Sequence, residues 1–97
     1  MANPPVVGDL YTAVMTFTTR SGLPIDPAWI NFYYRTPQTN VLIEKTLASN
    51  PSLFRHVATG HYEFDISIAE YGQYKVRYET DLGVMEGSFT SVQSEVL

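Results

Sequence analysis

The chain contains no cysteine among its 97 residues. This absence excludes disulfide bonds, thiolate nucleophiles and the usual cysteine-based structural zinc sites. Long apolar runs are also missing, since no stretch of about 18 consecutive apolar residues occurs, and the first residues have neither a basic start nor an apolar core. We therefore expect no signal peptide, no membrane span and a protein that is synthesised in the cytosol.

Charge is scarce as well. Charged residues make up 16% of the chain and the net charge is −4, whereas an average domain has about 25% charged residues. The six basic residues are scattered, so no basic stripe is available for a phosphate backbone and nucleic-acid binding is not expected. A lightly charged surface favours contact with other protein. The seven tyrosines suit both strands and partner surfaces.

Alternating apolar and polar residues dominate the pattern, and no segment has a helical period of useful length. The length allows one domain with one core. Turn signals rich in proline, glycine and asparagine separate about seven short strands, which predicts a two-sheet antiparallel β-sandwich. The predicted strands cover residues 10–19, 29–35, 41–47, 53–59, 60–68, 72–79 and 84–92.

Residues 60–79 form the clearest pattern, and we interpret them as a hairpin at the heart of the sandwich. The residues expected to face the core are Tyr62, Phe64, Ile66, Ile68, Tyr74, Val76 and Tyr78. The outer face would be charged, and opposite charges on the two neighbouring strands could pair there. These outer residues are Glu63, Asp65, Lys75, Arg77 and Glu79.

Catalytic and metal-binding patterns are weak. His61, Glu63 and Asp65 share one strand face, but they stand about 7 Å apart and would need a fourth ligand from elsewhere. No G-x-S-x-G elbow, glycine-rich phosphate loop or clefted carboxylate pair is present. We therefore predict no enzyme activity and no catalytic, metal or cofactor-binding residue.

Candidate binding residues lie at the N-terminus and on the strand at residues 29–35. Pro4 and Pro5 favour an extended arm over residues 1–8, which is either a disordered tail or an arm on a partner; the tail is favoured for the isolated chain. Trp29, Tyr33 and Arg35 share the face opposite the predicted core residues. Trp29 either covers a sandwich edge or anchors an interface; stacking on sugar is a third use. The expected domain limits are 1–8 (arm), 9–92 (sandwich) and 93–97 (tail).

The chain contains several turn and core motifs: F-x-x-x-S-G-x-P-x-D-P from Phe17, G-x-Y-x-F-x-I from Gly60, G-x-Y-x-V-x-Y from Gly72, and E-G-x-F from Glu86. Together they resemble small immunoglobulin-like structural proteins of tailed bacteriophages and prophages. The resemblance covers roughly residues 8–92 and is moderately specific for fold and weakly specific for role, because one sandwich serves many functions.

The resemblance implies an immunoglobulin-like sandwich in a non-enzymatic virion protein, a head decoration or cement protein. Its partner would be the major capsid protein or another virion structural protein, and its location the capsid surface after synthesis in the host cytoplasm. A head-to-tail connector or tail component, a surface carbohydrate-adhesion module and a homo-oligomer are open alternatives. The candidate interface residues are Pro4, Pro5, Trp29, Tyr33 and Arg35.

Overall fold

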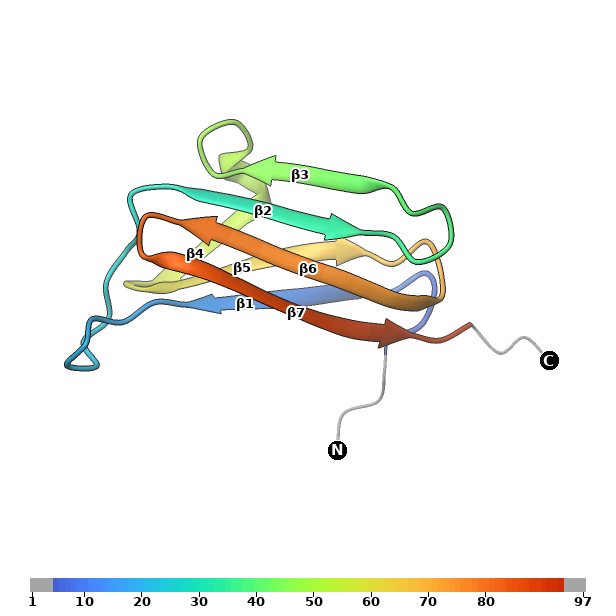
Figure 1. Cartoon of the computed structure of the whole chain (residues 1–97), viewed down its shortest axis with the longest axis horizontal. Helices are drawn as coiled ribbons and strands as arrows, with labels where there is room; N and C mark the ends of the chain where they lie inside the picture. The colour runs from blue at the N-terminus through green and yellow to red at the C-terminus, as the bar shows by residue number, and fades with distance from the viewer. Residues whose placement is uncertain (1–4, 94–97) are drawn as a thin grey trace.

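The computed structural model describes residues 5–93 and contains a strand at each of the seven predicted places (Figure 1). One short 3-10 helix, η1 (Pro51–Leu53), precedes the fourth strand. Within the described part of the chain, no helix has the length and apolar character needed to cross a bilayer. The strands are β1 (Leu10–Thr16), β2 (Ile30–Arg35), β3 (Leu42–Thr46), β4 (Phe54–Ala58), β5 (His61–Ser67), β6 (Gly72–Thr80) and β7 (Gly83–Ser91).

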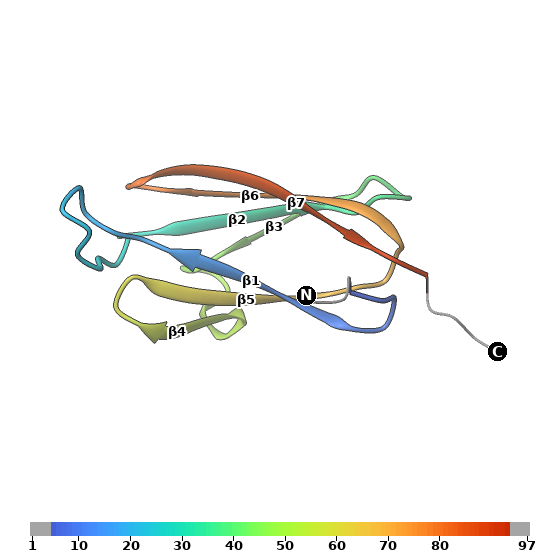
Figure 2. The ribbon, with the colours of Figure 1, turned by 90° about the horizontal axis from the view of Figure 1, so that it is seen from below.

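The strands form two antiparallel sheets packed face to face (Figure 2). One sheet has the order β1-β5-β4 and the other has the order β3-β2-β6-β7. If β1 is taken as strand B, these orders are B-E-D and C′-C-F-G, the immunoglobulin arrangement without a full strand A. The predicted all-β, immunoglobulin-like sandwich of about seven strands is therefore confirmed.

The predicted hairpin over residues 60–79 is wrong. β5 pairs with β1 and β4, whereas β6 pairs with β2 and β7, so the chain crosses from one sheet to the other between them. At this crossing the Tyr74 hydroxyl accepts a hydrogen bond from the Glu70 N–H at 3.2 Å, the tyrosine corner of immunoglobulin-like domains. Alternation reveals which face of a strand is buried but not which strand lies beside it. The pattern over residues 60–79 therefore fits both a hairpin within one sheet and a crossing between two sheets.

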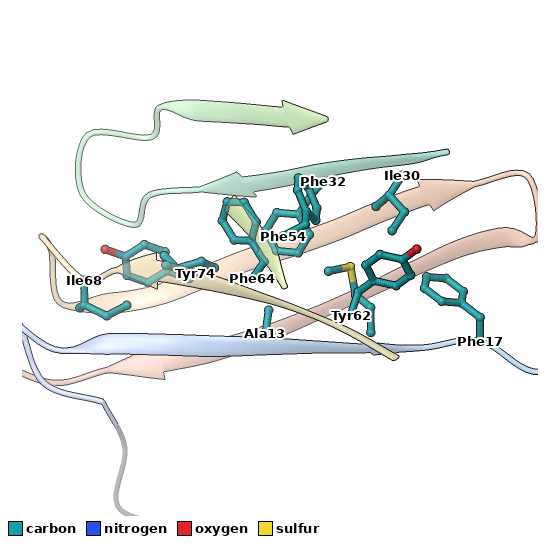
Figure 3. Packing of buried hydrophobic residues seen from close by; sticks show 11 residues of the cluster. Ala13, Phe17, Ile30, Phe32, Phe54, Tyr62, Phe64, Ile68 and Tyr74 are labelled. Carbon is teal, nitrogen blue, oxygen red and sulfur yellow. The ribbon is translucent and has the colours of Figure 1, made fainter. Parts of the chain in front are cut away.

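The core lies between the sheets and is rich in aromatic rings (Figure 3). Phe32 of β2 stacks on Phe64 of β5 with 4.6 Å between ring centroids, which joins the two sheets at their centre. A second stack links Tyr11, Phe89 and Tyr74. The residues predicted to face inward on β5 are buried, so that part of the prediction is confirmed even though the hairpin is not.

A loop contact holds one end of the sandwich together. The Asp26 carboxylate accepts the N–H of Gly60 at 2.6 Å, far away in the chain. The same oxygen lies 3.0 Å from Nε2 of His56. The Gly60 hydrogen bond, more than His56, lowers the pKa of Asp26. This carboxylate therefore links the residue 22–27 loop to the β4–β5 turn.

The N-terminal segment is tied to the sandwich where it is described. The Pro5 carbonyl accepts the Val92 N–H at 2.9 Å, and the Val7 N–H donates to the Val92 carbonyl at 3.1 Å. The Gly8 N–H donates to Ile68. The expectation of a disordered tail is thus wrong for residues 5–8, because hydrogen bonds fix them beside the end of β7. Pro4 lies outside the described residues.

Candidate functional site

The outer face of the four-stranded sheet is the best candidate for a binding surface. Because side chains alternate along a strand, burial of Ile30 and Phe32 turns Asn31, Tyr33 and Arg35 outward. The register places Tyr33 between Glu44 of β3 and Arg77 of β6. A shallow concavity of about 860 Å³ lies on this face. Outward side chains that line it are Tyr33, Arg35, Leu42, Gln73, Lys75, Arg77, Glu79, Glu86 and Ser88.

Tyr33 is fixed at the centre of this outer face. Its side chain is half-buried, and its hydroxyl donates a hydrogen bond to Oε1 of Glu79 at 3.2 Å. Burial, with smaller contributions from Glu44 and Glu79, raises the pKa of Tyr33 above its ordinary value. The phenol therefore stays neutral near neutral pH and offers an oriented ring.

Arg77 connects the acidic groups around Tyr33. Its guanidinium donates to Oε2 of Glu79 at 2.7 Å and to Oε1 of Glu86 at 3.1 Å. Such exposed pairs contribute little to stability, at most about 1 kcal/mol each. Their effect here is to hold charged groups in place across β6 and β7, so the polar surroundings of Tyr33 are ordered before any partner arrives.

Arg35 supports the end of the same surface. Its Nη1 donates to the Asn40 carbonyl at 3.1 Å, and Asn40 has a positive φ of 57°. The side chain thereby steadies the turn between β2 and β3. Leu42 lies opposite Arg35 in the register and is 53% exposed, which gives this end of the concavity an apolar rim.

Trp29 lies apart from the concavity. It directly precedes β2, is 44% exposed and does not line the hollow, so the strand is not buried on both sides. Arg35 lies six residue positions further along the extended chain, a span of about 20 Å. The Ala28 N–H donates to Oδ1 of Asp81 at 2.8 Å, which ties this segment to the β6–β7 turn. Trp29 is thus exposed at the far end of the strand that carries Tyr33.

The predicted interface residues therefore do not form one site. Tyr33 and Arg35 come together on the outer face, whereas Trp29 is at the other end of β2 and Pro5 pairs with Val92. The sequence missed the contributions of β3 and β7, because nothing in the local pattern indicates that those strands flank β2 and β6. Lys75, Arg77 and Glu79 were placed correctly on an outer face, but with the wrong neighbours.

The other charged cluster lies on the opposite sheet. Arg55 of β4 binds Glu63 and Asp65 of β5, with Nη2 3.0 Å from an oxygen of each. The Arg55 hydrogen bond is the main cause of the lowered pKa of Asp65. The expected pairing of these acids with Lys75 or Arg77 is wrong, because β5 and β6 belong to different sheets. Within residues 5–93, no group of three or more acidic or histidine side chains is arranged to hold a metal ion.

Comparison with known proteins identifies the fold alone. No family model matches the chain, and no curated protein matches it. A similar solved structure is a crystal structure from Bacteroides vulgatus described as a "putative glycoside hydrolase", with a TM-score of 0.61 and 12% sequence identity. The match covers 97% of this chain and 17% of that one, so the chain spans less than a fifth of that protein.

Proposed function

We propose that this chain is a non-enzymatic structural protein of a virus particle, a head decoration protein that binds the major capsid protein. The resemblance of its turn and core motifs to immunoglobulin-like proteins of tailed phages supports the role. The main support for the proposed docking surface is the oriented Tyr33 ring in the broad, shallow hollow on the outer face of the four-stranded sheet.

The chemistry of this outer face suits protein docking. Tyrosine and arginine are enriched among the residues that dominate interface energies, and a polar rim around them is typical. The nine residues of β6 extend about 30 Å, and four strands spaced about 4.8 Å apart give a flat area of about 500 Å². That is somewhat below the roughly 800 Å² per partner of a standard interface.

Trp29 extends the same surface. It continues the alternation of Asn31 and Tyr33 along β2, and its exposed ring offers an aromatic anchor beyond the hollow. Rigid strands hold Tyr33 in place, and the Ala28–Asp81 hydrogen bond fixes the segment just before Trp29. The proposal therefore predicts two separate aromatic contacts with the capsid.

A capsid-binding assay with matched variants tests the proposal. Arg77 and Arg55 both have side chains that are 47% exposed and both bind two carboxylates, but they lie on opposite sheets. Arg77→Ala and Tyr33→Ala should each weaken binding to expanded, empty capsids by about tenfold or more, whereas Arg55→Ala should bind normally. Circular dichroism would confirm that each variant folds.

The stoichiometry of the wild-type chain separates the possible virion roles. A decoration protein should saturate capsids in numbers comparable to the capsid subunits, and a connector or tail component should be present in about a dozen copies or fewer per particle, as expected for closed symmetric rings. Wild-type protein that does not bind capsids would contradict the decoration role. Capsid binding that Arg77→Ala and Arg55→Ala affect equally would contradict the docking face.

Carbohydrate binding is a second candidate, favoured by one feature of the hollow. The Tyr33 ring lies beside Glu79 and Arg77, and Gln73 lines the same hollow further along β6; an aromatic ring beside such polar groups can stack on and hydrogen-bond a sugar. The similar structure is part of a protein described as a "putative glycoside hydrolase". A glycan array with wild-type and Tyr33→Ala protein tests it: binding to a glycan that disappears in the variant supports this role, and the absence of any glycan signal contradicts it.

A further inference from the structure

β1 is an edge strand with one free side. Along the described chain it pairs only with β5, and Figure 2 views the sandwich from the side on which β1 and β7 lie. Hydrogen bonds from Phe17 to Gly60 and from Ile68 to Asp9 show that odd-numbered residues direct their backbone groups to β5. Since these groups alternate along a strand, the even-numbered residues direct theirs outward. These are Leu10, Thr12, Val14 and Thr16.

This edge lacks the features that usually prevent strand pairing. Edge strands are commonly protected by charges, prolines, bulges or a covering segment, and β1 has no charge, proline or irregularity in its seven residues. Leu10 is 65% exposed and Val14 is 53% exposed. The other edge strands carry at least one such feature: β3 has Glu44 and Lys45, β4 has Arg55 and an irregularity after His56, and β7 has Glu86.

An apolar groove opens beside the same edge. It has a volume of about 240 Å³ and lies between β1 and β7. Ala13 and Met15 line it from β1, while Met85 and Gly87 line it from β7. Met85 is 57% exposed although it faces the space between the sheets, and Gly87 adds no side chain. A strand laid against β1 would cover the mouth of this groove and bury Met85 further.

We infer that the occupant is a second copy of this chain, which pairs its own β1 antiparallel to the first. With Ala13 opposite Ala13 of the second copy, Thr12 faces Val14 and Leu10 faces Thr16. Even-numbered residues then meet even-numbered residues, so the free backbone groups form a complete ladder of about eight hydrogen bonds. No charge opposes a like charge in this register, and the threonine and valine side chains form favourable cross-strand pairs.

Self-pairing would be unfavourable at β3, which is an edge strand of the four-stranded sheet. A two-fold axis at the middle of β3 places Glu44 opposite Glu44, and like charges directly opposite one another are destabilising. β1 avoids this repulsion because it is uncharged. The pairing joins the two β1-containing sheets into one continuous sheet and leaves the outer face of each four-stranded sheet free. The inference therefore stands independently of the proposed capsid docking.

Sedimentation of the full chain over a wide concentration range tests the inference. The wild-type protein should change from monomer to dimer with rising concentration. Val14→Lys should weaken dimerisation by about tenfold or more, because it puts two charges beside the ladder. Val57→Lys is the matched control, since Val57 is 56% exposed on β4 at the other edge of the same sheet, and it should dimerise like the wild type.

A cysteine variant tests the register itself. Because the chain has no native cysteine, Ala13→Cys introduces a single thiol, which lies opposite its counterpart at a non-hydrogen-bonded pair about 4.5 Å apart between Cα atoms. Mild oxidation should give a covalent dimer much faster than for Thr90→Cys on β7. A wild-type chain that remains monomeric at every concentration, with no faster cross-linking at position 13, overturns the inference, even if β1 accepts a strand from another protein.

Discussion

Replacing Gly60 with alanine should destabilise the fold more than the same replacement at Gly22. Both glycines have a positive φ, 73° at Gly60 and 88° at Gly22. A Cβ added at Gly22 meets nothing within 4 Å, whereas one added at Gly60 lies 2.5 Å from the Phe17 carbonyl oxygen and 2.9 Å from the Ile25 nitrogen. Both obstacles at Gly60 are backbone atoms, so no side chain can rotate away to relieve the contact.

The two substitutions share one unfavourable term and differ in another. Left-handed backbone costs alanine about 1–2 kcal/mol at either site. At Gly60 the backbone must also move, which weakens the Phe17–Gly60 hydrogen bond of 2.8 Å and the Gly60–Asp26 hydrogen bond of 2.6 Å. Each is worth about 0.5–1.5 kcal/mol. We therefore expect a loss of about 2–5 kcal/mol for Gly60→Ala and about 1–2 kcal/mol for Gly22→Ala.

Urea denaturation followed by Trp29 fluorescence and circular dichroism would measure the two losses. A difference of 1 kcal/mol corresponds to about 4–8 °C in Tm for a domain of this size, so thermal unfolding should separate the variants clearly. Equal losses for Gly60→Ala and Gly22→Ala would refute the argument, because the close approach of the backbone at Gly60 would then have no energetic consequence.

Two further predictions concern the connection between β5 and β6. Glu70 accepts hydrogen bonds from the N–H of Gln38 at 2.7 Å and of Thr39 at 3.0 Å, and its pKa is lowered from 4.5, chiefly by the Thr39 hydroxyl. A carboxylate with a lowered folded-state pKa stabilises the fold above its unfolded pKa, and this stability is lost as pH falls through the folded-state value. The Tm of the wild type should therefore drop below about pH 4.5, and the Tm of Glu70→Gln should drop less steeply. Parallel curves of Tm against pH for the two proteins would contradict this. Tyr74→Phe should lower the free energy of unfolding by about 1–2 kcal/mol, because the Glu70 N–H loses its acceptor. Chemical denaturation measures this loss. An unchanged denaturation midpoint would show that the hydrogen bond between Glu70 and Tyr74 is dispensable.

The sequence was a good guide to elements whose signal is local. Strand positions followed from alternation and from the proline and glycine turns between them, and the inward residues Tyr62, Phe64, Ile66 and Tyr74 are buried as predicted. At residues 41–43 three apolar residues follow one another, so alternation does not indicate which face is buried. The structure places β3 at a sheet edge, with Leu42 exposed.

The candidate site was only partly predictable. Tyr33 and Arg35 could be placed on one strand face from their spacing. Glu79 and Arg77 join Tyr33 only because β6 lies beside β2, and Glu86 joins Arg77 only because β7 lies beside β6. The expected charge pairing between residues 63–65 and 75–77 failed for the same reason. Partners across a sheet depend on which distant segments pair, and that information is absent from the local pattern.

By itself, the sequence determined seven strands, the faces that β2, β5 and β6 bury, and a surface with few charges. Tertiary structure decided that β5 and β6 belong to different sheets, that residues 5–8 pair beside the end of β7, and that β1 has one unpaired edge within residues 5–93. The physical reason is the range of each interaction. Side-chain alternation is set by the geometry of neighbouring residues, whereas strand order is set by long-range packing of the aromatic core and by the backbone hydrogen bonds that this packing permits.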